Sequence, residues 1–306
     1  MKRQMVIMVF ALFIGTLAAP PMGALAIDLD LKGSLGEGKH KRYVPPVSNP
    51  FFNENPYITT EVRPYYLNNT IPAEFLTGGG QIQAWAAQIR IALTDRLGII
   101  ATKDGYVNAD FRNALLDTEG AENIAFGLKY ALLSDPARDR ILSLGIKFEV
   151  PTGSVGTSGL SLQGGGSGFT DVFMSAAGTV PTMWNKIGLQ GSFGFNLANN
   201  GAHDSSMVHY AFHADYELPF NIFPLVEING FSTINDGSRT AGVNFEGIDL
   251  VNFGSVRSGH VATLNAGARY KISKNIQIGG GYEFPITNRR DLMKYRINAD
   301  LVISFN

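Results

Sequence analysis

The stretch YRINADLVISF, residues 295–305, decides the fold. Its odd-numbered positions, from Tyr295 to Phe305, carry apolar side chains, and its even-numbered positions are polar except for Val302. A period of two residues is typical of a β-strand with one apolar face. About ten such residues are also the length that a tilted strand needs to cross the hydrocarbon core of a bilayer. The stretch therefore predicts a membrane-spanning strand.

The same alternation recurs along most of the chain. Twelve strands are expected, near residues 57–66, 81–94, 97–107, 122–133, 140–150, 170–180, 186–197, 208–218, 222–233, 260–272, 275–284 and 294–305. The connections between them alternate between short turns, such as 273–274, and long polar loops, such as 234–259. Short periplasmic turns and long outer loops are typical of bacterial outer-membrane barrels, and an even number of strands returns both chain ends to the periplasm. A water-soluble sandwich gives no reason for this alternation.

Strands with this pattern can cross a membrane only as part of a closed sheet. Every backbone N–H and C=O in lipid must be paired inside the protein, and closure also removes the exposed strand edges of an open sheet. We therefore predict an all-β protein, a transmembrane antiparallel β-barrel of about 12 strands formed by residues 57–306. It is a porin-like architecture of Gram-negative bacteria.

The start of the chain predicts export. Lys2 and Arg3 precede an apolar run, Met5–Ala18, and Ala24-Leu25-Ala26 supplies the small-x-small pattern of a cleavage site. This is the pattern of a Sec signal peptide, residues 1–26, cleaved after Ala26. The expected location is the outer membrane, with its lipid as a partner. The last strand, with Phe305 near its end, resembles the signal that the barrel-assembly machinery recognises.

Residues 27–56 lie between the signal peptide and the first predicted strand, and they have no clear period. They include Lys39-His40-Lys41-Arg42 and Pro45-Pro46. Two interpretations stay open for this segment, a flexible periplasmic arm or a partial plug folded into the lumen.

If the apolar faces point to lipid, the opposite faces line the interior. The lumen-facing residues, and hence the expected substrate path, are then Glu61, Arg63, Arg90, Lys129, Lys147, Glu149, His209, His213, Asp215, Glu217, Glu227, Arg269, Glu283, Arg296 and Asp300. Because the lining has both positively and negatively charged side chains, it does not indicate strong ion selectivity. These charges either pair and fill a narrow lumen or border a constricted aqueous path. His209, His213, Asp215 and Glu217 share one strand face and could form one pH-sensitive patch.

Composition removes several classes of function. The chain has no cysteine, and its formal net charge is −1, so thiol chemistry is excluded and nucleic-acid binding is not indicated. No cofactor, metal site or catalytic residue is predicted. The loop residues His203, Asp204 and Ser205 are of catalytic types, but adjacent residues cannot build a nucleophile–base–orienter geometry.

Two stretches resemble a known family. Asn123–Leu133 followed by Leu142–Lys147 and Val150-Pro151-Thr152-Gly153 is similar to the "GLKY…LGIK…PTG" pattern of outer-membrane transporters labelled MetA-pathway of phenol degradation. Gly168–Val172, Leu264–Tyr270 and Gly279–Tyr282 fit the later strands of that pattern. The resemblance implies a channel that passes small compounds, often aromatic or hydrophobic, and it brings no catalytic residues.

The preferred function is therefore a non-enzymatic outer-membrane channel for passive diffusion of small solutes, hydrophobic or aromatic compounds among them. Two alternatives stay open. One is a barrel-wall lipid hydrolase of the phospholipase or lipid A deacylase type, which needs a Ser–His pair within hydrogen-bond reach near the outer rim. The other is a plugged adhesion or structural barrel that acts through its outer loops.

Overall fold

The structure is a computed structural model, and it describes residues 30–305 apart from 164–165, 184, 241–243 and 255–258. The predicted signal peptide and its cleavage point after Ala26 lie outside the described residues.

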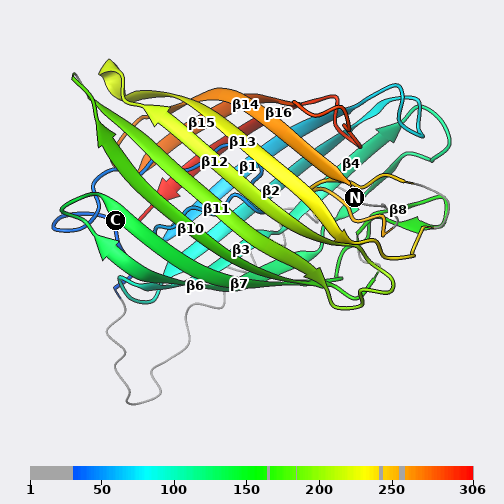
Figure 1. The fold of residues 1–306 in the computed structure, drawn as a ribbon, viewed down its shortest axis with the longest axis horizontal. Coiled ribbons are helices and arrows are strands. Elements are labelled where there is room, and N and C mark those ends of the chain that lie inside the picture. The colour runs from blue at the N-terminus through cyan, green and yellow to red at the C-terminus, as the bar shows by residue number, and fades with distance from the viewer. Residues whose placement is uncertain (1–29, 164–165, 184, 241–243, 255–258, 306) are drawn as a thin grey trace, which may run out of the picture.

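The described chain forms one closed antiparallel barrel (Figure 1). Its strands are β1 (Glu61–Ile71), β2 (Gly80–Ala92), β3 (Leu97–Lys103), β4 (Gly105–Phe111), β5 (Thr118–Ala121), β6 (Ile124–Asp135), β7 (Arg140–Val150), β10 (Phe169–Pro181), β11 (Lys186–Ala198), β12 (Ser206–Tyr216), β13 (Ile222–Asn235), β14 (His260–Lys271), β15 (Ile276–Pro285) and β16 (Tyr295–Ser304). A small hairpin, β8 (Gly156–Thr157) and β9 (Leu160–Ser161), lies in a long loop, and a short 3₁₀ turn, η1 (Pro219–Asn221), precedes β13.

Each strand pairs with its neighbours in sequence, and β1 closes the barrel by pairing with both β2 and β16. β4 continues β3 after a break at Asp104, because both pair with β2. In the same way β5 leads into β6 across Glu122 and Asn123. The fourteen paired segments are therefore twelve strands around the barrel. In the described part of the chain, no helix has the length and apolarity needed to span a bilayer.

The predicted twelve-stranded barrel is confirmed, and each of the twelve expected segments overlaps an observed strand. The clearest shift concerns the first strand, expected at 57–66 and observed as Glu61–Ile71. Tyr57 and Ile58 are buried inside the barrel with Leu35 and Val302, so the chain is still crossing the interior where the sequence predicted a strand.

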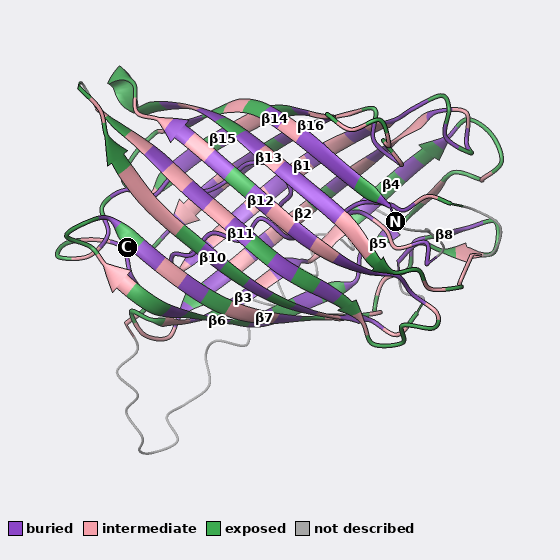
Figure 2. Cartoon of the chain, viewed as in Figure 1, coloured by how far each residue is buried: buried purple, intermediate pink, exposed green. Residues whose placement is uncertain are grey.

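The outward face of the barrel is apolar and exposed. Along β6, the side chains of Ile124, Phe126, Leu128 and Tyr130 are 45–48% exposed, whereas Lys129 between the last two is 1% exposed. The exposed and buried classes alternate along the strands in this way (Figure 2). Such a band of outward apolar side chains over the strands is what a barrel presents to lipid.

The interior is filled by protein. Residues 40–58, which we call the interior segment, run within the barrel, and they are nearly all buried. At the end with the long loops, Phe51 and Phe52 join an apolar cluster with the outer-loop residues Ile248, Leu250 and Phe253. The predicted lumen-facing positions therefore meet other parts of the chain.

Candidate functional site: an occupied lumen

The fifteen predicted lumen residues lie on the inward side of the barrel wall or at its rim. Thirteen of them are buried. Glu149 is half-buried beside Lys103, with 2.8 Å between its Oε1 and the lysine Nζ. Glu217 follows the end of β12 and its side chain is 40% exposed. Alternation thus locates the inward faces, and the contacts of these side chains define the site.

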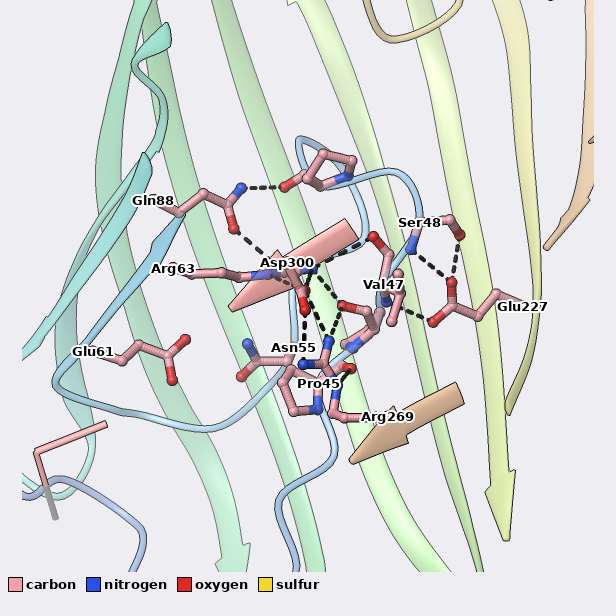
Figure 3. A network of polar contacts seen from close by, with 12 residues as sticks. Pro45, Val47, Ser48, Asn55, Glu61, Arg63, Gln88, Glu227, Arg269 and Asp300 are labelled. Atoms are coloured by element: carbon pink, nitrogen blue, oxygen red, sulfur yellow. Dashed lines mark hydrogen bonds and ion pairs between the residues drawn. The ribbon is translucent and has the colours of Figure 1, made fainter. Parts of the chain in front are cut away.

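At the centre of the lumen, two arginines share one carboxylate (Figure 3). Arg63 Nε lies 2.7 Å from Asp300 Oδ2, and Arg269 binds both oxygens of Asp300 at 2.9 and 2.8 Å. The same arginines donate to the carbonyl oxygens of Pro46 (2.6 Å, from Arg63) and Pro45 (2.9 Å, from Arg269). Two wall strands, β1 and β14, therefore hold the interior segment through its main chain, and Asp300 of β16 positions their arginines.

Glu227 of β13 binds the next residues of the segment. Its carboxylate accepts hydrogen bonds from the main-chain amides of Val47 and Ser48 at 2.8 and 2.7 Å (Figure 3). It also accepts hydrogen bonds from the side chains of Ser48, His213 and Asn265. A buried carboxylate is tolerated where its oxygens are hydrogen-bonded in this way.

A second ion-pair network holds the far end of the segment. Glu54 binds Arg90 of β2 at 2.9 and 2.6 Å and Lys129 of β6 at 2.7 Å. Arg90 also lies 3.2 Å from Glu61, which accepts a hydrogen bond from the hydroxyl of Tyr43. All of these side chains are buried. The charges of the lumen wall are thus compensated partly by charges on the segment.

Of the cluster expected from His209, His213, Asp215 and Glu217, the last three are connected to one another, and His209 belongs to a different network. His209 contacts Asp171 at 2.7 Å. His213 contacts Asp215 at 3.2 Å in addition to Glu227, while Arg42 contacts both Asp215 and Glu217. His209 lies apart because its partner is Asp171 of β10, whereas Arg42 of the interior segment joins Asp215 to Glu217.

Outer loops close the lumen at the opposite end from the short turns. Asp249, in the loop between β13 and β14, binds Arg296 with two contacts of 2.7 and 2.8 Å. Phe75 of another loop packs on Phe245 and Phe253, with ring centroids 4.6 and 6.5 Å apart. We call residues 244–254 the outer cap.

Little open space remains between the interior segment and the outer cap. A cavity of about 30 Å³ is bordered by Phe52, Lys103 and Asp249, among others. That volume holds one or two water molecules. The described residues therefore show a lumen closed by the interior segment and the outer cap together. Among them, no group of three His, Asp or Glu side chains is arranged to hold a metal ion.

Several residues of these networks were not predicted to face the lumen. They are Arg42, Glu54, Lys103, Asp171 and Asp249. Arg42 and Glu54 lie in a segment without a period, and Asp249 lies in a loop. Asp171 did carry a signal, because it stands on the inward face of β10, but the apolar Phe173 on the same face obscured the alternation.

The Ser, His and Asp residues of loop 202–206 do not form a catalytic arrangement. Ser205 donates its hydroxyl to the carbonyl oxygen of Asp236, and Ser206 accepts from the amide of Ala198. Both hydroxyls are thus directed away from His203, which contacts Asp204.

A Ser–His pair does occur on the outward face of the wall. Ser232 Oγ lies 2.7 Å from His260 Nδ1, across the β13–β14 pairing near the loop end of both strands. His260 is exposed and stacks on Tyr210, with 6.3 Å between the ring centroids. Within the described residues, no carboxylate contacts His260.

No family model and no curated protein matches the chain. Among solved structures, the COG4313 outer membrane channel from Pseudomonas putida F1 is similar, with a TM-score of 0.58, 15% identity, and coverage of 85% of this chain and 100% of that one. The NanC porin follows with a TM-score of 0.45, 10% identity, and coverage of 81% and 99%. The Pseudomonas putida toluene transporter TodX has a TM-score of 0.42, 11% identity, and coverage of 90% and 98%. The first similarity shows that the chain has the fold of an outer-membrane channel, and membership of the MetA-pathway family stays a prediction.

Proposed function

We propose that this protein is an outer-membrane channel for passive diffusion of small solutes, hydrophobic or aromatic compounds among them, and that the structure corresponds to its closed form. Opening requires residues 40–58 to move away from the centre of the lumen and the outer cap to move away from its loop end. The small solute would then follow the wall residues predicted above, from Glu61 to Asp300. No energy source is part of the proposal.

One observation carries the proposal. The barrel has an apolar outer face, and its interior is filled by a segment of the chain that only hydrogen bonds and ion pairs hold in place. A barrel built only for rigidity could fill its interior with packed apolar side chains, as small barrels do. Here the wall instead carries buried ionisable groups such as Arg63, Glu227 and Arg269, which bind a separate segment of chain. Displacement of that segment and of the outer cap would leave a polar passage.

The test uses a reversible tether. The chain has no cysteine, so a pair introduced at Ser48→Cys and Asn229→Cys forms the only possible disulfide. The side chains of these residues are in contact, with 2.9 Å between Asn229 Nδ2 and Ser48 Oγ. We expect single-channel current steps from the wild-type protein in a planar bilayer, silence from the oxidised variant, and recovery of the steps after reduction.

Two results would contradict the proposal. Steps that persist in a variant shown by mass spectrometry to be fully oxidised would mean that the interior segment does not control conduction. Silence from the wild type and from the reduced variant, both folded, would exclude an aqueous channel and favour the adhesion or structural alternative.

The contact between Ser232 and His260 favours a second candidate function, a lipid-facing hydrolase. A serine hydroxyl bonded to an imidazole is the minimal nucleophile–base arrangement. Its test is labelling by a fluorophosphonate probe in outer-membrane lipid. Labelling that is lost in both Ser232→Ala and His260→Ala would support this function, whereas an unlabelled wild type would exclude it without affecting the channel proposal.

A further inference from the structure

We infer that the lumen is a binding site for proline-containing peptides, and that residues 43–56 occupy this site as an intramolecular ligand. The segment has a turn at Asn49–Asn53, where the amide of Asn53 donates to the carbonyl oxygen of Asn49 at 2.9 Å. The inference rests on the proposed channel function, because a peptide supplied from outside must be able to enter the lumen. Its basis is the way in which the wall contacts the interior segment, which is mainly through the main chain.

The first part of the segment is bound through consecutive carbonyl groups. The carbonyl oxygens of residues 43–46 accept hydrogen bonds, in order, from Gln277, Gln190, Arg269 and Arg63, at 3.2, 2.5, 2.9 and 2.6 Å. These four donors come from β15, β11, β14 and β1. Because every residue carries a carbonyl group, these contacts do not depend on which side chains the segment has.

The contacts continue to the end of the segment. Gln88 donates to the carbonyl oxygen of Pro50 at 2.5 Å, and Lys147 and Ser192 donate to the carbonyl oxygens of Phe51 and Phe52. Lys129 and Ser143 donate to those of Asn55 and Pro56 at 2.7 and 2.5 Å. The wall is therefore rich in donors along the whole path of the segment.

A donor-rich wall suits a ligand that has many carbonyl groups and few N–H groups. Four of the fourteen residues 43–56 are prolines, and proline has a carbonyl group but no N–H. Proline also favours the extended polyproline conformation, so less conformational entropy is lost on binding. The main-chain amides of Val47 and Ser48 meet the one acceptor described above, Glu227.

Among the side chains of the segment, Glu54 carries the charge that adds specificity. Glu54 is fully buried between Arg90 and Lys129, and charge-assisted contacts of this kind are stronger than neutral ones. The ligand class is therefore a peptide with several prolines, a turn in its middle and an acidic residue near its C-terminal end.

The experiment supplies the segment as a separate peptide. Residues 43–56 of the full chain are replaced by a Gly/Ser linker of equal length, and the fluorescent peptide YVPPVSNPFFNENP is added to the refolded barrel. We expect binding by fluorescence anisotropy and block of the single-channel current. The matched control is the all-D peptide, which has the same composition and charge but a mirror-image backbone, and we expect it to bind at least about tenfold more weakly. A peptide with Gln in place of Glu54 should also bind about tenfold or more weakly.

If the linker variant refolds poorly, the refolding yield becomes the readout. The L-peptide present during refolding should restore the folded barrel, and the D-peptide should not. Equal effects of the two enantiomers, or a folded linker variant that binds neither, would overturn the inference. A folded linker variant that gives no current steps would contradict the channel proposal instead, because anisotropy measures binding independently of conduction.

Discussion

Glu54 and Arg90 form a buried, bidentate ion pair, with contacts of 2.9 and 2.6 Å, although 36 residues separate them in the sequence. Arg90 belongs to the barrel wall and Glu54 to the interior segment, so this pair fixes the position of one within the other. Removing two charges from water is costly, and such a pair is retained only where its geometry is nearly complete. Loss of one partner leaves the other charge buried without compensation.

The substitution Glu54→Gln should therefore loosen the interior segment. Arg90 would keep Glu61, at 3.2 Å, as its one anionic contact and Gln88, at 3.3 Å, as a neutral one, and Lys129 would keep only a carbonyl partner. Breaking a buried pair in this way costs about 3–5 kcal/mol. We expect more frequent channel openings in a planar bilayer and faster protease cleavage within residues 40–58. Glu37→Gln is the matched control, since Glu37 is exposed in the same part of the chain. Openings equal to those of the control would show that the ion pair does not hold the segment.

Asp300→Asn should destabilise the barrel itself. Arg63 and Arg269 both bind this carboxylate, and all three side chains are buried. The free energy of unfolding should fall by about 3–5 kcal/mol, because two guanidinium groups lose their shared anion. Urea unfolding in lipid vesicles, followed by tryptophan fluorescence, measures the change. The exposed turn residue Asp95 supplies the control Asp95→Asn, and a similarly small shift for both variants would contradict the prediction.

Asp249→Asn should release the outer cap and leave the interior segment in place. Asp249 contacts Arg296 through both oxygens, whereas Arg296 keeps Glu283 at 3.8 Å. We expect faster protease cleavage in the loop between β13 and β14, with unchanged cleavage within residues 40–58. Asp110→Asn, at an exposed position of β4, controls for a general effect of the lost charge. If cleavage in both places rises together, the outer cap and the interior segment form one cooperative unit.

The barrel could be predicted because lipid favours apolar side chains and the lumen favours polar ones, so adjacent residues of a strand differ in polarity. Leu128 and Lys129 are adjacent, yet one is 48% exposed to the outside and the other 1% exposed within. This contrast, repeated along the strands, produces the two-residue alternation of apolar and polar residues that is visible in one sequence. The break at Asp104 was not predicted, although the buried positions shift across it from even-numbered in β3, such as Ile100, to odd-numbered in β4, such as Val107. Adjacent apolar residues, Ile99 and Ile100, hide this shift of phase in the sequence.

The position of the interior segment could not be predicted for a related reason. Gln190 and Gln277 bind main-chain carbonyl groups of the segment. Because every residue has such a group, the sequence does not indicate which residues are bound in this way. The partner of His209 was equally hidden, because Asp171 lies 38 residues away on another strand. Contacts to the main chain and between strands require the three-dimensional register, which alternation alone does not provide.

The outer cap should open as the pH rises, through Glu246. Burial raises the pKa of this carboxyl group to about 7, and a hydrogen bond from the amide of Phe253 only partly opposes the effect. In an opened loop the same group would titrate near its ordinary value of 4.5. The closed loop therefore holds more protons than the open loop between about pH 4.5 and 7, so closure is most stable below this window and weakens as the pH rises through it. The pKa of the neighbouring Asp291 is also raised by burial, which acts in the same direction.

Protease cleavage of the loop between β13 and β14 measures this effect. We expect cleavage to be slow at pH 5 and several-fold faster at pH 8, after correction for the activity of the protease on an unfolded substrate. Glu246→Gln keeps a neutral side chain of the same shape, so its cleavage should stay slow and depend much less on pH. Glu74→Gln, at an exposed position of another outer loop, should behave as the wild type does. If Glu246→Gln shows the full wild-type pH dependence, another group controls the cap, and Asp291→Asn becomes the variant that must remove it.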